Sequence, residues 1–405
     1  MDTNYDAIVV GAGPAGSSCA ALLAMKGCRV LLLDKQHFPR DKPCGDALGG
    51  KALSIASLLG VRGEIAKRAF LRQSGVVFSS PNGSEVEIQV DGGADGEGGG
   101  FVCRRRDFDS ILFSNAKKIC DAHDGAEVAD VLQEDGRFCG VRVKMEGGAV
   151  REFFANLLVG ADGAASLVAR KAGVFSSDAH HTCSAVRGYY SGVAGLRKNI
   201  EVHFLPECMP GYFWIFPLSE TEANIGVGML ISDMVSKKAN LQKVLAECMK
   251  NKRFGKRFER SRLHGGLSGW SIPLASAHRR CSGNGWVLIG DAASLVDPFS
   301  GECIGNGLKS AAIAAGTLAS AARLGPVGPE KCAEYERTLW SEIGSDVQSS
   351  YMLQKMGKVP FLIDIAIGKA KRSKWVRDEF SAMISSREAK GRASDPLFSL
   401  RVLLS

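Results

Sequence analysis

The order of apolar and polar positions near the start of the chain predicts a strand-helix-strand unit. Residues 7–10 and 29–33 are short apolar runs, which is the pattern of strands buried inside a parallel sheet. The segment between them predicts a helix with Pro14 near its first turn, where the missing N–H costs nothing. Strand, helix and strand in this order indicate a β-α-β unit.

After the β-α-β unit, apolar and polar residues first alternate strictly, as in a half-buried strand, and apolar residues then recur at helical spacing. Residues 76–78 and 86–90 alternate and are joined by Pro81-Asn82-Gly83, so they predict a β-hairpin. Residues 91–100 hold six glycines and predict a mobile loop. Residues 104–118 predict a helix whose apolar face carries Phe108, Ile111, Leu112 and Ala116.

The rest of the chain predicts strands in its middle and helices at its end. Residues 180–272 mix strands with one helix around residues 241–250. After the last predicted strand a long helix runs to Arg323, and the chain from Glu330 onward is helical and rich in Lys and Arg. The remaining apolar runs predict strands at residues 127–132, 139–144, 153–159 and 285–289.

Strands with helical crossovers, interrupted by antiparallel strands, predict an α/β chain of mixed α+β character. We expect a discontinuous cofactor domain that carries an inserted antiparallel-sheet substrate domain and is followed by a helical C-terminal tail. The cofactor domain is predicted at residues 1–74, 101–179 and 273–329, the substrate domain at 75–100 (a hairpin) and 180–272, and the helical region at 330–405.

A glycine-rich turn after the first strand carries the first chemical signal. Gly11 permits a tight turn, Gly13 lets a pyrophosphate approach the backbone, and Gly16 lets the next helix pack closely on the sheet. The start of that helix presents free N–H groups and a positive dipole end to phosphate. Asp34 ends the second strand, where its carboxylate can accept hydrogen bonds from a ribose diol. These features predict a dinucleotide site; the alternative is a glycine-rich turn without a ligand.

Composition and charge narrow the class of protein. The chain has 405 residues, 45% hydrophobic and 23% charged, which is ordinary for a soluble globular protein with a sizeable core. A formal charge of +8 suggests an anionic ligand or a membrane surface, although solubility alone explains it equally well. Twelve scattered cysteines without a C-x-x-C pair favour reduced thiols in a cytosolic protein, and the seven histidines show no metal spacing.

The chain shows neither a membrane span nor a leader. The longest small-apolar stretch, residues 310–322, is Ala-rich and too short to cross a bilayer. The few residues ahead of Tyr5 cannot carry a secretory or transit segment. We therefore expect a cytoplasmic protein.

Later motifs resemble those of a known flavoprotein group. They are Arg105-Arg106-Asp107-Phe108-Asp109, Gly160-Ala161-Asp162-Gly163, and Gly290-Asp291 followed by Asp297-Pro298 and Gly301-Glu302-Cys303-Ile304-Gly305. With the glycine turn they resemble the motif set of the FAD-dependent group A flavoproteins, which have the hydroxybenzoate-hydroxylase-like fold. The resemblance runs from residue 6 to about residue 320 and implies a Rossmann-type FAD-binding domain with FAD as cofactor.

The third motif supports FAD on chemical grounds as well. Asp291 at a strand end can accept a ribityl hydroxyl, although a helix N-cap is the alternative. The turn and helix start at residues 301–305 offer N–H groups and a positive dipole to the flavin's pyrimidine edge, where negative charge collects on reduction. Cys303 departs from the family's usual glycine and would crowd the flavin or place a thiol beside it. The resemblance assigns cofactor contacts to Gly11, Gly13, Ala15, Gly16, Asp34, Arg40, Cys44, Gly45, Arg105, Val128 (main chain), Asp162, Asp291, Pro298, Gly301, Cys303 and Ile304.

Within this fold two stretches resemble the geranylgeranyl reductase family. One is Pro39-Arg40-Asp41-Lys42-Pro43-Cys44-Gly45-Asp46, which is similar to the bacterial prenyl-chain and menaquinone side-chain reductases. The other is Tyr212-Phe213-Trp214-Ile215-Phe216-Pro217, followed by Asn224-Ile225-Gly226-Val227-Gly228. The resemblance implies an oxidoreductase that saturates isolated C=C bonds of an isoprenoid chain, by hydride transfer from N5 of the reduced flavin and delivery of a proton.

These stretches also predict the substrate wall and the proton donor. Tyr212, Trp214 and Phe216 project to one face of a strand and, with Gly228, are assigned to the prenyl chain; an ordinary core strand is the alternative. Cys44 either donates the proton or orders the loop under the flavin, and a buried inert thiol is the alternative. As a donor it should keep an ordinary thiol pKa of roughly 8.5 and stay protonated at neutral pH.

Three other functions fit the same scaffold. A flavin-dependent halogenase carries W-x-W-x-I-P on the corresponding strand, but this chain has Tyr212 and Phe216 at two of those positions. The stretch Trp270-Ser271-Ile272-Pro273 is similar to that motif, but it lacks the first Trp and lies later in the chain than the strand on which halogenases carry the motif. An aromatic hydroxylase is the second alternative, and a non-catalytic flavoprotein that binds an isoprenoid is the third.

The sequence also indicates how the flavin is reduced and which partners the protein binds. Only one dinucleotide fingerprint is present, so NADPH or NADH visits transiently or a small electron carrier reduces the flavin. The tail at residues 369–377 combines basic residues with Trp375 and favours peripheral contact with an anionic membrane, while a solvated helix face is the alternative. We expect an isoprenoid lipid substrate, no metal, no nucleic-acid partner, and a monomer or weak dimer.

Overall fold

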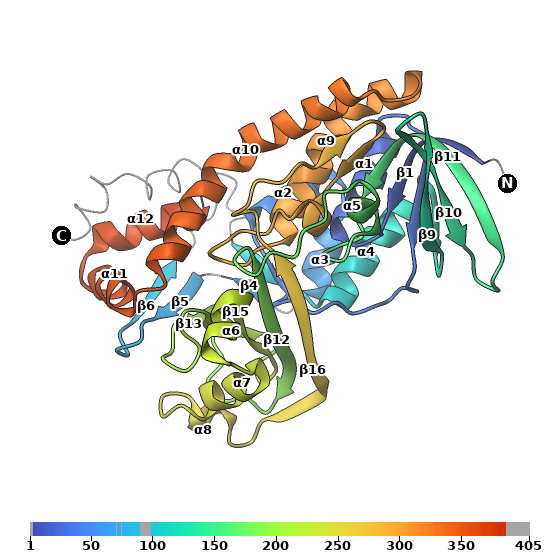
Figure 1. Ribbon diagram of the computed structural model, residues 1–405. Coiled ribbons are helices and arrows are strands. Elements are labelled where there is room, and N and C mark those ends of the chain that lie inside the picture. The colour runs from blue at the N-terminus through green and yellow to red at the C-terminus, as the bar shows by residue number, and fades with distance from the viewer. Residues whose placement is uncertain (1–2, 70, 74, 90–98, 386–405) are drawn as a thin grey trace.

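The computed structural model describes residues 3–69, 71–73, 75–89 and 99–385. Two large sheets and one small sheet form the frame of the molecule. Helices cover the first large sheet, and a helical C-terminal region runs from that sheet towards the second (Figure 1). The mixed α/β class predicted from the sequence is confirmed.

The first sheet has eight strands, and its centre is parallel. Its parallel strands lie in the order β18 (Trp286–Leu288), β11 (Val150–Gly160), β1 (Asn4–Val10), β2 (Val30–Asp34) and β8 (Asp121–Asp124). The short strand β17 (Ser282–Gly283) pairs antiparallel with β18 at one edge. The antiparallel pair β9 (Glu127–Glu134) and β10 (Arg137–Lys144) branches off beside β11. The central strands are nearly all apolar because both faces of the sheet are covered.

Small side chains let two helices approach each other closely beside this sheet. Helix α1 (Pro14–Met25) buries Ala20 and Ala21, and it packs against the Ala-rich helix α9 (Ile304–Leu324). The apolar stretch at 310–322 is thus an interior helix, and among the described residues no helix is long and apolar enough to cross a bilayer. The other elements here are α2 (Gly50–Leu58), α3 (Arg62–Arg68), α4 (Arg105–Lys117), α5 (Leu167–Lys171) and the 3₁₀ turn η1 (Gly290–Ala293).

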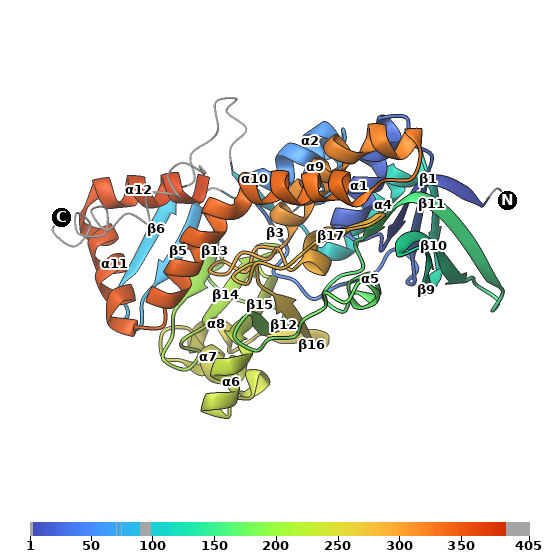
Figure 2. The same cartoon turned by 45° about the horizontal axis from the view of Figure 1, so that its top comes forward.

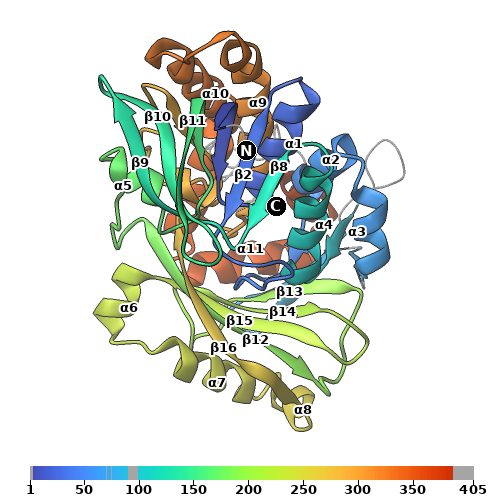
Figure 3. The same cartoon turned by 90° about the vertical axis from the view of Figure 1, so that its right-hand side faces the viewer.

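The second sheet has seven strands and lies below the first in Figure 3. Helices α6 (Ile231–Lys237), α7 (Leu241–Lys250) and α8 (Gly255–Phe258) cover the face that points away from the first sheet. The predicted hairpin is confirmed as its last two strands, and the first strand of the hairpin also pairs in parallel with a strand from much later in the chain. The strand order is β16 (Arg262–Pro273), β12 (Thr182–Ser191), β15 (Ala223–Leu230), β14 (Tyr212–Pro217), β13 (Asn199–His203), β5 (Gly75–Ser79) and β6 (Glu85–Gln89).

A third, small sheet was not predicted. It consists of β3 (Ala47–Leu48), β7 (Gly100–Val102) and β4 (Leu71–Gln73). Strands of two or three residues are too short to show a period, so the sequence gives no signal for them. Residues 91–98 of the predicted glycine-rich loop, and Val90 of the predicted hairpin, lie outside the described residues.

The C-terminal helices connect the two large sheets. Helix α10 (Pro329–Met356) begins beside β17 and β18, where the Tyr335 hydroxyl donates to Leu288 O at 2.8 Å. It continues past the second sheet to α11 (Pro360–Arg372) and α12 (Lys374–Ser385), as Figure 2 shows. Ile363 and Ile367 of α11 pack with Ile88 of β6, so the tail is held by an apolar contact with the hairpin.

Candidate active site

The glycine turn after β1 leaves space where a phosphate would bind. Gly11 has φ +97°, and an added Cβ on Gly16 would lie 1.7 Å from Gly11 O, so α1 can begin this close to β1 only with glycine there. At Gly13 an added Cβ would meet only Arg40 Nη2, at 3.5 Å. The α1 N-terminus has no side-chain cap among the described residues and no acidic residue in its first turn. The turn therefore fits a pyrophosphate group.

Asp34 and Arg40 lie beside this turn. Asp34 Oδ2 accepts the Ala12 N–H at 2.8 Å and Oδ1 accepts the Gln36 N–H at 2.9 Å, so Oδ1 keeps a lone pair for a ribose hydroxyl. Arg40 Nη2 lies 3.4 Å from the same carboxylate, and Nη1 donates to Asp109 Oδ2 at 3.0 Å. Arg40 Nε is buried without a partner among the described residues, which leaves one donor for a ligand.

Arg105 is held in place by a carboxylate on its own helix. Its Nε donates to Asp109 Oδ1 at 2.7 Å and its Nη2 to Asp109 Oδ2 at 2.8 Å, and both side chains are buried. Because Arg40 binds the same carboxylate, Asp109 joins the two arginines that the resemblance assigns to FAD. Asp109 was not predicted as a site residue, although it ends the Arg105 motif.

The third cofactor segment is paired with the loop after β2. Lys42 Nζ donates to Asp291 Oδ2 at 2.8 Å. Burial would raise the pKa of Asp291, but the Lys42 ammonium outweighs it and the pKa is lowered, so the carboxylate stays ionised. On the other side, Ala15 packs against Gly290, where an added Cβ would lie 3.1 Å from Ala15 Cβ. Lys42 was not predicted as a site residue, because nothing marks it in the sequence except its position between Arg40 and Cys44.

Two assigned residues serve the local fold. Asp162 caps α5, because it accepts the Leu167 N–H and the Ser166 hydroxyl, each at 2.6 Å. Val128 lies in β9, two residues after the Ala126 N–H that donates to Asp34 O at 2.8 Å. The structure thus places Val128 near the ribose end of the site and Asp162 at a helix start. Their contact with FAD stays a prediction.

Asp297 organises the turn that precedes α9. Its Oδ1 accepts two N–H groups of that turn, one of them from Ser300 at 2.9 Å, and its Oδ2 accepts the Ser350 hydroxyl of α10 at 2.6 Å. The Pro298 carbonyl accepts a second bond from α10, from Gln354 Nε2 at 2.7 Å. The long C-terminal helix α10 therefore stabilises this turn through two hydrogen bonds, a role that was not predicted from the sequence.

The start of α9 is open towards the site. Gly301 has φ +71°, and an added Cβ there would lie 2.9 Å from the Tyr212 hydroxyl. Cys303 is the N-cap of α9 and Ile304 its first residue, and among the described residues the cap receives no side-chain hydrogen bond. The first N–H groups of α9 and its positive dipole end are thus available to a ligand, whereas the Gly301 N–H donates to Asp297 O at 3.1 Å and the Glu302 N–H to Ser300 Oγ at 3.3 Å. The contact of this turn with FAD stays a prediction.

The thiols of Cys44 and Cys303 affect each other's pKa, although they come from distant parts of the chain. The hydrogen bond from Cys303 lowers the pKa of Cys44 in spite of its burial, and the Arg105 guanidinium lowers it further. The same hydrogen bond, together with burial, raises the pKa of Cys303. Of the two thiols, Cys44 is therefore the more acidic and Cys303 the one that holds its proton more tightly. The expected ordinary pKa of Cys44 is wrong, because that expectation included neither neighbour.

A buried hydrogen-bond network fixes the loop that carries Cys44. Asp46 is fully buried, has φ +69°, and donates its N–H to Cys44 Sγ at 3.4 Å. Asn224 Nδ2 donates to Asp46 Oδ2 at 2.8 Å and to Cys44 O at 2.6 Å, while its Oδ1 accepts the Trp214 Nε1–H at 3.0 Å. Burial and the neighbouring Cys44 raise the pKa of Asp46 to about 7. The network joins this loop to β14 and β15, a contact that was not predicted from the sequence.

Strand β14 separates a core face from a face turned towards the cofactor segments. Phe213 and Ile215 pack into the apolar cluster under α7. Tyr212, Trp214 and Phe216 form a row on the opposite face, with successive ring centroids 6.0 and 6.3 Å apart. The second face of the strand is thus a continuous aromatic surface, which we call the aromatic row.

The aromatic row ends against both cofactor-side segments. Phe216 lies on Gly45, where an added Cβ would be 2.7 Å from the ring. At the other end the Tyr212 hydroxyl donates to Ser300 O at 2.6 Å. Gly228 pairs with Tyr212 across β14 and β15, so it lies beside that end of the row on the neighbouring strand, and its contact with the substrate stays a prediction. The structure therefore brings the Cys44 loop, the turn before α9 and the aromatic row together.

Comparisons with known proteins agree with this arrangement. A profile of the family described as FAD binding domain matches residues 4–337. The chain is 34% identical over 345 residues to menaquinone reductase of Mycobacterium tuberculosis (strain H37Rv), a match that covers 80% of each protein. It is 33% identical over 322 residues to digeranylgeranylglycerophospholipid reductase 1 of Methanopyrus kandleri, covering 76% of this chain and 78% of that protein.

Solved structures share the fold. A geranylgeranyl bacteriochlorophyll reductase-like protein from Thermoplasma acidophilum superposes with a TM-score of 0.85 at 22% identity, over 99% of this chain and 98% of that one. A flavin-dependent brominase superposes with a TM-score of 0.80 at 21% identity, over 99% and 98%. Because reductases and halogenases share this architecture, the fold alone does not decide the reaction.

Proposed function

The chain belongs to the FAD binding domain family, and from that premise we propose that it is a FAD-dependent oxidoreductase that saturates isolated C=C bonds of an isoprenoid chain. The observation that carries the proposal is the aromatic row, which stands against the Cys44 loop and the turn before α9. Such a row offers a long apolar surface to a flexible prenyl chain. Two relatives, named for the reduction of menaquinone and of digeranylgeranylglycerophospholipid, support the same chemistry.

The chain's own residues provide a binding site for each part of FAD. When bound, FAD supplies a hydride from N5 of its reduced ring. The α1 start and Gly13 would bind the pyrophosphate, Asp34 the ribose, and Asp291 the ribityl chain next to Lys42. The open start of α9 would offer its positive dipole end to the pyrimidine edge.

The thiol pair is the proton source in this proposal. Each saturated bond takes up one hydride and one proton, and Cys303 holds a proton beside the Cys44 thiolate. When that proton moves to carbon, the pair keeps an extra negative charge, which the Arg105 guanidinium stabilises until a proton arrives from solvent. The electron pair enters from a nicotinamide nucleotide or a small electron carrier.

A peripheral membrane contact fits the corner between α10 and α11. Phe361 is 67% exposed and Val359 46% exposed, although both are apolar. Lys358 Nζ pairs with Asp233 of α6 at 3.0 Å, which brings the 71% exposed Val235 to the same corner. Exposed apolar side chains with lysines around them suit an anionic lipid surface, and the basic tail at 369–377 continues from this corner.

The proposal is tested without oxygen. Holoenzyme is photoreduced under nitrogen, a prenyl lipid is added, and the flavin absorbance is followed while the lipid is analysed by mass spectrometry. We expect the flavin to reoxidise as the lipid gains hydrogen. A flavin that stays reduced while the lipid binds indicates a carrier protein, and hydroxylated or halogenated product that forms only with oxygen indicates a monooxygenase or a halogenase.

A further inference from the structure

The outer surface of α6, α7 and α8 concentrates the positive charge of the protein. Residues 235–262 contain ten Lys or Arg and two Glu, which is a net charge of +8. The whole chain has the same net charge, so its remaining residues are neutral in sum. Figure 3 shows that these helices lie on the side of the second sheet that points away from the first sheet. A charge asymmetry of this kind indicates an anionic partner.

The folding of this segment places its basic side chains on the outside. The buried residues of α7 recur at helical spacing and pack into the apolar cluster of the second sheet. Lys243 and Lys250 lie about two turns apart on the opposite, exposed face. Around α8 the apolar side chains are again buried and the basic ones exposed. We use the name basic face for six exposed side chains: Lys243, Lys250, Lys252, Lys256, Arg260 and Arg262.

Arg257 attaches the basic face to the rest of the fold. Its Nη1 donates to Glu201 Oε2 at 2.7 Å and its Nη2 to Glu201 Oε1 at 2.8 Å, and Glu201 is buried in β13. Its Nε also donates to Ala194 O at 3.0 Å. One arginine of the segment therefore points inward and is neutralised, while its neighbours stay outside on a backbone that is fixed to the sheet.

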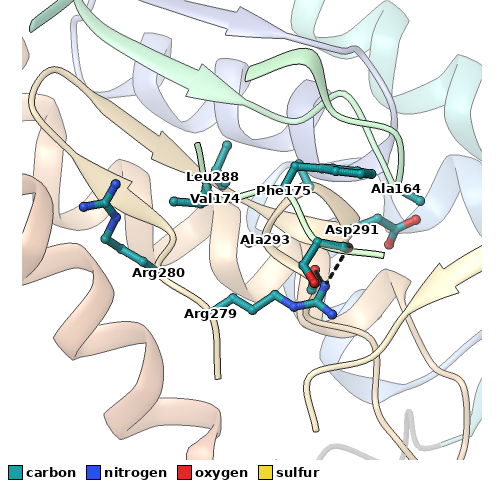
Figure 4. Close-up of a pocket in the computed structure, with 11 residues that line it drawn as sticks. Ala164, Val174, Phe175, Arg279, Arg280, Leu288, Asp291 and Ala293 are labelled. Atoms are coloured by element: carbon teal, nitrogen blue, oxygen red, sulfur yellow. Dashed lines mark hydrogen bonds between the residues drawn. The ribbon is translucent and has the colours of Figure 1, made fainter. Parts of the chain in front are cut away.

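The side chains of the basic face lack carboxylate partners. None of the six forms an ion pair within the part of the chain that the structure describes. The segment's own carboxylates, Glu247 and Glu259, are exposed among them. Cations near the cofactor segments are held differently: Arg279, for example, donates to Ser294 Oγ at 2.6 Å inside the fold (Figure 4). The charges of the basic face therefore remain available to an anionic surface.

The basic face adjoins the apolar corner of α10 and α11. Exposed Val235 lies on α6, and the preceding Asp233 pairs with Lys358 Nζ at 3.0 Å, two residues before the corner's first helical turn. Exposed Phe361 belongs to that turn. Basic side chains beside exposed apolar ones are the composition of a surface that binds anionic lipid.

The aromatic row leads towards the same corner. The Tyr212 ring lies 6.4 Å from the Phe204 ring, which stacks on Phe299 at 6.3 Å. These rings belong to one apolar cluster with Ile363 of α11. A prenyl chain that leaves a bilayer at the corner therefore meets apolar side chains between α11 and the row.

We propose that the basic face binds anionic lipid head groups and holds the protein on the membrane, with the corner of α10 and α11 inserted. The inference rests on the proposed function, because it names the surface that brings the enzyme to its membrane-dissolved substrate. The basic face attracts the membrane over a Debye length of roughly 8–10 Å, and the apolar side chains add their contribution only on contact. The two parts together fix the orientation of the protein.

Two other anionic partners fit the basic face less well. An acidic electron carrier must approach the flavin, but the cofactor segments lie on the other side of the second sheet (Figure 3). A single-stranded nucleic acid stacks its bases on exposed aromatic rings, whereas Phe254 and Phe258 of this segment are only 4% and 8% exposed. A membrane requires neither feature.

The binding test uses the full-length protein loaded with FAD and a variant that combines Lys252→Gln, Lys256→Gln and Arg260→Gln. Flotation is measured with vesicles of phosphatidylcholine, alone and mixed with phosphatidylglycerol, at low and at high salt. We expect the variant to bind the mixed vesicles about tenfold more weakly or worse at low salt, because each basic residue near an anionic membrane adds to binding. Binding equal to that of the wild type would overturn the proposal.

The matched control removes the same number of charges around the first sheet, by Lys67→Gln, Lys118→Gln and Lys144→Gln, all at exposed positions. It should float like the wild type, and flavin content reports whether each variant is folded. An equal loss in the control would show that only net charge matters and would contradict a specific surface. A wild type that ignores the mixed vesicles but is retained by RNA or by an acidic protein carrier would contradict it as well.

A turnover measurement separates this inference from the proposed function. Prenyl-lipid reduction is driven anaerobically with dithionite, once with the lipid in detergent and once with the lipid in mixed vesicles. We expect the basic-face variant to lose turnover about tenfold in vesicles and to match the wild type in detergent. An equal loss in detergent would refute the basic face as a membrane surface. Vesicle binding without turnover in either form would refute the proposed function and leave the surface assignment intact.

Discussion

The cofactor side and the reactive side of this site are built in different ways. The glycine turn, α1 and Asp34 come from one continuous stretch, and their geometry is set by close backbone contacts. The reactive side joins the Cys44 loop, β14 with β15, and the start of α9, which are far apart in sequence. The geometry of the cofactor side is therefore determined by neighbouring residues, whereas that of the reactive side depends on contacts between distant parts of the chain. We expect substitutions on the cofactor side to change the flavin content and substitutions on the reactive side to change the turnover.

The largest effect is expected for Cys44→Ser on the reactive side. The variant should retain bound FAD and lose turnover by about 10²-fold or more, the usual range for a disabled proton transfer, because Cys303 loses the thiol partner beside which it holds its proton. Flavin absorbance and anaerobic prenyl-lipid turnover measure the two properties separately. Cys120→Ser, a partly buried thiol that donates within its own helix region, is the matched control. Unchanged turnover in Cys44→Ser would remove the thiol pair from the reaction.

Asp46 should make the stability of the reactive side depend on pH. Its pKa is about 7 in the folded protein, against about 3.9 for an unfolded chain. The folded state therefore binds more protons between these values, so stability falls as pH rises from about 4 to about 7, by at most about 4 kcal/mol. Cys44, Arg187, Tyr189 and Asn224 are the groups that act on this carboxyl.

Asp46→Asn tests this directly. Urea midpoints of the variant should change less between pH 5 and pH 7.5 than those of the wild type. Glu134→Gln, on the surface of β9, is the control and should keep the wild-type dependence. A variant with the full wild-type pH dependence would contradict the raised pKa.

On the cofactor side, Gly13→Ala should weaken FAD binding and leave the fold intact. The added methyl group meets only Arg40 at 3.5 Å, so the protein has room for it, but it occupies the space proposed for the pyrophosphate. We expect FAD affinity to fall about tenfold, measured by fluorescence titration of apoprotein, since one lost charged contact accounts for that change. Gly63→Ala, at an open position of α3, is the comparison. Equal FAD affinity in both variants would contradict the assignment of Gly13.

A smaller effect is expected for Trp214→Phe. The change keeps a ring in the aromatic row but removes the hydrogen bond to Asn224, so the loop that carries Cys44 is held less firmly. Losing one neutral hydrogen bond contributes about 1 kcal/mol, so kcat/KM for a prenyl lipid should fall about fivefold while FAD content stays unchanged. Loss of FAD in this variant would show that the two sides are not separable.

The smallest effect is expected at the exposed corner of α10 and α11. Phe361→Ser should reduce flotation with anionic liposomes a few-fold and leave FAD content and turnover of detergent-solubilised lipid unchanged. Leu324→Ser, at an exposed position at the other end of the molecule, is the control. Equal flotation of both variants and the wild type would place the membrane contact elsewhere.

The difference between local and long-range contacts also explains which features could be predicted from the sequence. The β-α-β unit, the hairpin and the C-terminal helices follow from local periodicity, and all of them are confirmed. Lys42, Asp46 and Asn224 lie within the stretches that carry the resemblance, but their partners are separated from them by more than a hundred residues. Side-chain pairs of that kind leave no periodic signal. For the same reason the pKa of Cys44 was predicted wrongly, because Cys303 acts on it from a distant helix.

The central claim is that this site passes an electron pair to an unactivated alkene of a prenyl chain. A single-turnover experiment tests it most directly: a known amount of photoreduced holoenzyme is mixed anaerobically with a prenyl lipid, and the product is analysed by mass spectrometry. The account predicts one C=C bond saturated for each flavin oxidised. Flavin oxidation that leaves the lipid at its original mass would contradict it.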